Sequence, residues 1–336
     1  MPKLAIPFNN DFRGILGLVK QFKDKIAEVY FPLPKEVCGS GRIIDTQHTY
    51  YNDLMKSFVR NLHDLGVKAN LVVNSLSSWH IYESEKKVKL LYDTIDYYIM
   101  DIQIDILTTT NPVIAQEFYR DVAVHGSTNL FVNTIHKAQY LKDLKFRGIC
   151  IDRDKNRDVE FIKAVKQLGL ETKVLVNEGC IPFCMSRITH FDALSPGYST
   201  QPSSSYHEKI LDTSCRFLYI KHPELLIKTP IIRPEDLSYY DMVDIAKISG
   251  RTLPTNIIEK MVRAYATRSW DGQLEDIVDN PVYQRSTAEL KIRINNKLFP
   301  SEFGKVTSSC DFKCQQNRCS LCEKTLELVS SGKRVS

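Results

Sequence analysis

Apolar strand-like segments alternate with amphipathic helical segments through most of this 336-residue chain. The first strand is expected at residues 4–8, and residues 12–26 carry apolar side chains at helical spacing. Further strands are expected at residues 28–33, 67–74, 104–109, 121–125, 148–152 and 173–177. This alternation is typical of βαβ units, and it predicts an α/β fold with a parallel sheet.

Two more strand candidates, residues 226–232 and 243–248, bring the total to nine. A closed (β/α)8 barrel needs eight. Either the two candidates share the role of one barrel strand, or one of them is an additional strand. Residues 256–269 are expected to form a long helix, after which the composition becomes polar and rich in cysteine. We therefore place a domain boundary near Asp279, with an α/β barrel over residues 1–279 and a cysteine-rich, metal-binding extension over residues 280–336.

The overall composition is that of an ordinary globular protein, with 43% hydrophobic and 25% charged residues. The 45 basic residues exceed the 40 acidic ones by too little, and too diffusely, to argue for a nucleic-acid surface. No stretch approaches the ~18 apolar residues that a membrane span needs, and no signal peptide is visible. We therefore expect a cytoplasmic protein, in which an odd count of nine cysteines does not form a disulfide framework.

Two cysteines lie just beyond the strand expected at residues 173–177. Cys180 and Cys184 follow a polar turn made by Asn177, Glu178 and Gly179. Thiolates at this spacing are natural ligands of iron-sulfur iron or zinc, although two buried structural cysteines would give the same pattern.

Several of the expected strands end in polar side chains, which a barrel would gather around one mouth. These residues are Asn9, Asn74, Thr109, Asn111, His125, Asp152 and Asn177. The alternative interpretation for each residue is that it is an ordinary helix cap or turn residue.

Four segments carry a resemblance to a known family. They are Asn177-Glu-Gly-Cys180 with Cys184, Cys215-Arg-Phe-Leu-Tyr219, Ile232-Arg-Pro-Glu-Asp-Leu237 and Lys247-Ile-Ser-Gly-Arg251. In their order and setting they resemble the peptidase U32 family, over roughly residues 4–251. The resemblance implies a TIM-type (β/α)8-like barrel with a four-iron four-sulfur (4Fe-4S) cluster at its mouth. Members with established roles hydroxylate ubiquinone precursors, transfer RNA or ribosomal RNA without molecular oxygen, whereas an older name calls the family collagenase-like peptidases.

This chain departs from the family pattern in three places. The usual His-Gly-Ala before the first cysteine is replaced by Asn177-Glu178-Gly179, which indicates a divergent branch. Ser238 stands where many members have a fourth cysteine, so the resemblance leaves Cys180, Cys184 and Cys215 as cluster ligands. The missing ligand is then Cys38, a cysteine of the tail, or none, and the last case would leave one iron open to substrate.

The third departure is the cysteine-rich tail. Its spacing is Cys310-x3-Cys314-x4-Cys319-x2-Cys322, and four thiolates within so short a span can close on one ion or cluster. The centre is shorter than the usual zinc-ribbon loop, which favours a second 4Fe-4S cluster, with zinc as the alternative. A reduced, cysteine-bearing tail without metal is the third possibility.

Charged residues near the barrel cysteines are candidates for catalysis. Arg187, His190, Lys247 and Arg251 are placed to bind an anionic substrate such as a carboxylate at the rim, or else to form structural salt bridges. Glu178 would donate a proton or support a cluster ligand, or else act as a helix N-terminal acid. The motifs GxSxG, HExxH, GxGxxG and the Walker loop are absent from the sequence.

The first functional hypothesis is an iron-sulfur-dependent enzyme that carries out oxygen-independent hydroxylation or a related modification. The alternatives are a U32-type peptidase and a non-catalytic iron-sulfur or zinc binding protein. The substrate is expected to be a small carboxylate, a peptide or an RNA, and the sequence is compatible with a homodimer or a heterodimer. No membrane span is expected.

Overall fold

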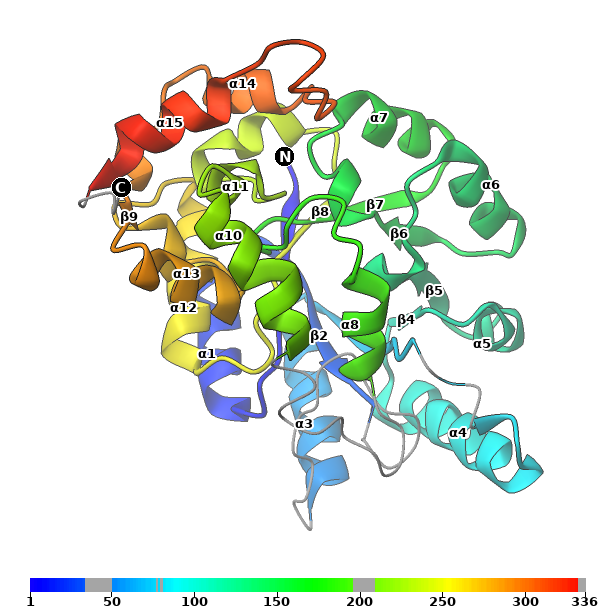
Figure 1. The fold of residues 1–336 in the computed structure, drawn as a ribbon. Coiled ribbons are helices and arrows are strands. Elements are labelled where there is room, and N and C mark those ends of the chain that lie inside the picture. The colour runs from blue at the N-terminus through cyan, green and yellow to red at the C-terminus, as the bar shows by residue number, and fades with distance from the viewer. Residues whose placement is uncertain (34–49, 77, 79–80, 196–208, 332–336) are drawn as a thin grey trace.

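The computed structural model describes residues 1–33, 50–76, 78, 81–195 and 209–331 (Figure 1). Eight strands each pair in parallel with the next, and the eighth pairs with the first, which closes a barrel. This confirms the predicted TIM-type (β/α)8-like fold. The strands are β1 (Lys3–Pro7), β2 (Ile26–Pro32), β3 (Lys68–Val73), β4 (Ile106–Thr109), β5 (Ala123–Gly126), β6 (Gly148–Cys150), β7 (Glu171–Leu175) and β8 (Ile245–Lys247).

The ninth strand candidate, residues 226–232, was wrong. Its first residues belong to α11 (Leu225–Lys228), and the rest is an irregular segment. Pro230 lies in the middle of the segment and has no N–H to donate to a neighbouring strand, so it disfavours a place inside the sheet.

Helices surround the barrel as an outer layer (Figure 1). The predicted helix at residues 256–269 is confirmed as α12 (Thr255–Thr267). Side-chain caps fix several helix starts; Asp11, for example, accepts a hydrogen bond from the backbone N–H of Gly14. The other helices of this layer are α1 (Phe12–Phe22), α3 (Tyr51–Asp64), α4 (Glu85–Tyr97), α5 (Pro112–Phe118), α6 (Ile135–Asp143) and α7 (Val159–Gln167). Short helical turns lie between these helices and the strands, namely η2 (Tyr98–Ile102) after α4, η3 (Thr128–Leu130) before α6 and η4 (Arg153–Lys155) before α7.

A long excursion separates β7 from β8. Within the described residues it contains α8 (Arg187–Ala193), the π-helical turn η5 (Asp212–Arg216), α10 (Phe217–Lys221), α11 and η6 (Pro234–Tyr240). It brings Cys215 of η5 back over the barrel mouth, close to the residues that follow β7.

The chain after α12 packs on this excursion (Figure 1). Helix α13 (Pro281–Glu289) contacts η5 and α10, and α15 (Leu321–Val329) contacts α11. The remaining elements are η7 (Leu274–Asp276), β9 (Arg293–Ile294), η8 (Asn296–Leu298), α14 (Phe303–Thr307) and β10 (Ser330–Ser331), with β9 and β10 paired antiparallel. The boundary proposed near Asp279 stays a prediction.

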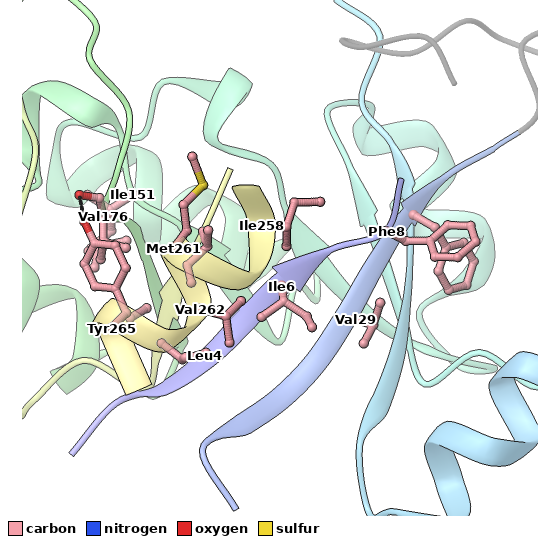
Figure 2. Packing of buried hydrophobic residues seen from close by; sticks show 14 of the residues in the cluster. Leu4, Ile6, Phe8, Val29, Ile151, Val176, Ile258, Met261, Val262 and Tyr265 are labelled. Atoms are coloured by element: carbon pink, nitrogen blue, oxygen red, sulfur yellow. Dashed lines mark hydrogen bonds between the residues drawn. The ribbon is translucent and has the colours of Figure 1, made fainter. Parts of the chain in front are cut away.

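The outward face of β1 forms a core with α12 (Figure 2). Leu4 and Ile6 lie against Ile258 and Val262, and all four are buried. The Tyr265 hydroxyl donates to the carbonyls of Val176 and Ile232 at 3.0 Å each, which ties the helix to the segment after β7. In the part of the chain that the structure describes, no helix has the length and apolar character needed to cross a bilayer.

Candidate functional site

The barrel interior holds a buried network of charged and polar side chains. Lys173 of β7 lies 2.5 Å from the carboxylate of Glu28 on β2, and both side chains are at most 3% exposed. Asn70 donates to the same carboxylate at 2.9 Å and accepts from Thr108 at 2.8 Å. Burial alone would raise the pKa of Glu28, but the positive charge of Lys173 holds it below its usual value.

Lys247, at the end of β8, places a second ammonium group inside the barrel nearer its mouth. Its Nζ lies 4.1 Å from the centroid of the Tyr30 ring, and the Arg251 guanidinium lies 5.9 Å from the same ring. Burial is the main cause that lowers the pKa of Lys247 to about 8; the charges of Lys173 and Arg251 act in the same direction, and Cys150 and Glu28 oppose them.

A cavity of about 60 Å³ opens at the carboxyl ends of the strands, where barrel enzymes bind their ligands. The cationic groups of Lys247, Arg251 and Arg153 line it together with polar residues of other strand ends. These residues are Asn74, Thr128, Asn129, Glu178 and Ser249. A space of this size and polarity suits a small anionic group such as a carboxylate.

The ion pair of Arg153 and Glu178 separates this cavity from a neighbouring one. The Arg153 Nε lies 2.5 Å from the Glu178 Oε2, and the two side chains are 3% and 7% exposed. The Arg153 guanidinium also lies 4.4 Å from the centroid of the Phe191 ring. Glu178 and Phe191 line both cavities, so they form the wall between them. Sequence reasoning missed Arg153, although its position directly after the strand-end residue Asp152 was a usable signal.

The second cavity, of about 310 Å³, contains the three barrel cysteines. Cys180 and Cys184 come from the loop after β7, and Cys215 comes from η5. The Cys215 thiol hydrogen-bonds to Cys184, which lowers the pKa of Cys184 to about 6, while Cys215 keeps its proton. Burial raises the pKa of Cys180 to about 11. The structure thus brings together the three thiols that the family resemblance implied.

Arg187 fixes the loop that carries the first two thiols. Its guanidinium donates to both oxygens of Asp154, at 2.7 and 2.9 Å, and to the Ile181 carbonyl at 2.8 Å. Asp154 also accepts from the backbone N–H of Phe183 at 2.9 Å. Arg187 is therefore engaged in holding the Cys180–Cys184 loop, and His190 lines the same cavity.

Gly179 is required at its position by lack of space. A Cβ atom there would lie 2.7 Å from the Val278 side chain and 3.0 Å from the Tyr283 ring. The Gly179 carbonyl accepts hydrogen bonds from the hydroxyl of Tyr219, at 2.7 Å, and from the side-chain amide of Asn280. The turn before Cys180 is thereby anchored to α10 and to the residue before α13.

The four tail cysteines line a different cavity, of about 230 Å³. The two cysteine groups are linked by one aromatic contact, because the rings of Phe183 and Phe312 meet edge to face with centroids 5.2 Å apart. Phe183 lies between Cys180 and Cys184, and Phe312 lies between Cys310 and Cys314.

Three thiols in one cavity are a donor set that an iron-sulfur cluster or zinc takes. As the side chains stand, however, no group of three or more His, Cys, Asp or Glu residues in the described ranges is arranged so that it could hold a metal ion. The residue type suits a cluster, but the three thiols would have to move to hold one. Cys38, one of the candidates for a further ligand, lies outside the described residues.

The prediction that His125 lies at the barrel mouth was wrong. The His125 side chain does not lie at the mouth but faces a cavity of about 370 Å³ lined by Lys68 and Glu171, the first residues of their strands. The stagger of barrel strands brings the end of β5 toward the opposite opening. Burial holds the pKa of His125 well below its ordinary value, so this imidazole is neutral. By contrast, Asn74 lines the cavity at the mouth, as predicted from its strand end.

The lowered pKa of Lys247 gives a prediction that can be tested without a substrate. We expect NMR of ¹³C-labelled lysines to show one side chain that titrates near pH 8, and the Lys247→Met variant to lose that signal. An unfolded chain holds this proton up to about pH 10.4, so between these values the unfolded state binds more protons and the contribution of Lys247 to stability rises with pH. Identical lysine titrations in both proteins would contradict this prediction.

Comparisons with known proteins give one relative along nearly the whole chain. The chain is 27% identical over 321 residues to the uncharacterized protease MJ1657 of Methanocaldococcus jannaschii, covering 95% of this chain and 93% of the relative. No family model matches the chain.

Among solved structures, the U32 peptidase Mk0906 is similar with a TM-score of 0.48 and 18% identity, covering 62% of this chain and 79% of that one. An O-GlcNAc hydrolase of Thermobaculum terrenum follows with a TM-score of 0.42 and 9% identity, over 85% and 62% of the two chains.

Proposed function

We propose, from the premise that this chain is a divergent relative of the peptidase U32 family, that it is an enzyme whose reaction takes place at the barrel mouth. The relative that matches 95% of the chain bears the name of a protease, which supports an enzymatic role. The two adjoining cavities at the mouth, one cationic and one lined by thiols, supply the chemical groups for such a role.

The finer proposal is an iron-sulfur enzyme in which Cys180, Cys184 and Cys215 are cluster ligands. The observation that carries it is the convergence of three thiols from two distant segments in one cavity beside the mouth. When bound, a cluster there would supply redox or Lewis-acid chemistry, which fits oxygen-independent hydroxylation or a related modification.

The protein's own groups would bind and orient the substrate. Lys247 and Arg251 would hold an anionic group in the small cavity, so binding should weaken as the pH rises above about 8 and Lys247 loses its proton. Glu178 reaches both cavities while Arg153 fixes its side chain, which places an oriented carboxylate between the bound substrate and the thiols.

A second candidate is a peptidase, and the name of the long relative favours it over hydroxylation. In that case the carboxylate of a peptide would bind to the same two cations. Cys184, whose pKa is lowered to about 6, would be the nucleophile, because the thiolate is the reactive form of cysteine.

Metal analysis of anaerobically purified protein separates the two candidates. Under the first, the Cys184→Ala variant loses about four iron and four sulfide per chain relative to wild type. The matched control is Cys150→Ala, because Cys150 is buried in β6 and lines neither cysteine cavity. An unchanged iron and sulfide content in Cys184→Ala would refute the barrel cluster.

Peptide cleavage provides the complementary measurement. If metal-free wild-type protein cleaves peptides and Cys184→Ala does not, the second candidate is supported and the first is not. Cleavage that persists in Cys184→Ala would exclude this cysteine as the nucleophile.

A further inference from the structure

The four tail cysteines line the 230 Å³ cavity and come from three consecutive short segments. Cys310 follows α14, Cys314 and Cys319 flank a turn, and Cys322 lies in the first turn of α15. The backbone N–H of Cys319 donates to the Cys314 carbonyl at 2.9 Å, which turns the chain back on itself.

The local backbone folds around the first cysteine. The backbone N–H of Phe312 hydrogen-bonds to the Cys310 sulfur. Phe312 and Arg318 adopt left-handed conformations, with φ of 60° and 49°. These conformations cost residues with a Cβ about 1 kcal/mol each, so some further interaction must stabilise this turn.

Charged side chains of both signs lie around the same cavity. Lys228 and Lys313 line it together with Asp311 and Glu323, and the charge of Arg157 acts on both Cys310 and Cys322. Four thiolates around a divalent cation carry a net charge of about −2, and nearby cations reduce the cost of that charge.

We propose that Cys310, Cys314, Cys319 and Cys322 bind one zinc ion, which fastens the segment after α14 to the start of α15. In the described part of the chain the thiols do not yet form a metal-ligand group, so binding requires them to turn into the cavity. Cys319 is exposed and the other three are partly exposed, which leaves room for this rotation. The same exposure favours zinc over an iron-sulfur cluster, because oxygen can oxidise an exposed cluster whereas the zinc ion has no redox chemistry.

A zinc ion here would have a structural role distinct from the function proposed for the barrel mouth. Helix α15 packs on α11, and β10 at its end pairs with β9. Closing residues 310–322 around a metal would therefore secure the attachment of the whole C-terminal segment to the barrel.

Metal content of the full-length protein tests the site directly. Wild type is expected to carry about one zinc per chain, and both Cys319→Ser and Cys322→Ser to lose it. Cys319→Ser is the decisive variant because this side chain is exposed and its replacement leaves the core intact. Ser320→Ala, next to it in the chain, is the matched control and should keep the zinc.

Two outcomes would overturn the proposal. One is a zinc content that is the same in wild type and Cys319→Ser, including none in either protein. The other is a loss of iron and sulfide from Cys319→Ser in place of zinc. A loss of iron and sulfide confined to Cys184→Ala concerns the barrel mouth alone, so the failures of the two proposals are distinguishable.

Limited trypsin digestion tests the structural role. We expect cleavage after Lys313 and Arg318 to accelerate on the order of tenfold in Cys319→Ser relative to Ser320→Ala, because the metal-free segment opens more often. Equal cleavage rates in the two variants would exclude the fastening role.

Discussion

Replacing Lys173 by Met is expected to lower the free energy of unfolding by about 3 to 5 kcal/mol. The substitution removes the cation 2.5 Å from Glu28 and leaves that carboxylate inside the barrel at 1% exposure. An uncompensated buried charge costs far more than the lost contact, because water cannot reach the carboxylate. Chemical denaturation of wild type and variant, compared at the same pH, measures the difference.

The double variant Glu28→Gln with Lys173→Met is the control for this effect. Gln at position 28 can still accept the hydrogen bond from Asn70, so the network keeps its neutral part. We expect the double variant to be clearly more stable than Lys173→Met alone, since no unpaired carboxylate remains. If the two variants are equally unstable, lost packing and not the buried charge is responsible.

Replacing Arg187 by Met is expected to cost about 3 to 5 kcal/mol and to disorder the cysteine loop. The guanidinium lies 3.5 Å from Asp152 and donates two hydrogen bonds to Asp154, so its loss leaves two carboxylates without this cation. The bond to the Ile181 carbonyl is lost as well, and with it a direct anchor of the loop between Cys180 and Cys184.

The Arg187→Lys variant distinguishes the effect of the lost positive charge from the effect of the lost hydrogen-bond geometry. It keeps the positive charge but cannot reproduce the paired bonds of a planar guanidinium to one carboxylate. We therefore expect Arg187→Lys to recover part of the unfolding free energy while iron and sulfide content remains well below wild type. Full metal content in Arg187→Met would show that the cysteine loop does not depend on this anchor.

The sequence predicted the barrel well because its strands are buried on both faces and therefore appear as short apolar runs. The prediction failed at residues 226–232, where an equally apolar run belongs partly to α11. Apolar composition indicates burial, and Ile231 and Ile232 are indeed buried, but it does not distinguish a strand from a packed irregular segment.

The candidate site was predicted in part. The position of Cys180 and Cys184 after a strand placed them at the mouth, but their position relative to Cys215 depends on a long excursion that no local pattern encodes. Arg153 and Tyr30 were missed for the same reason, because their importance lies in which residues they meet. Whether the cysteines form one group or two also required the fold, which places them in separate cavities.

We expect the edge-to-face contact of Phe183 with Phe312 to couple the order of the two cysteine loops. Each ring sits inside one cysteine loop, so ordering either loop lowers the entropy cost of ordering the other. If both proposed metal sites are filled, metal bound at one should raise the affinity at the other by the same factor in both directions. Phe312→Ala would remove this coupling while leaving all the thiols in place.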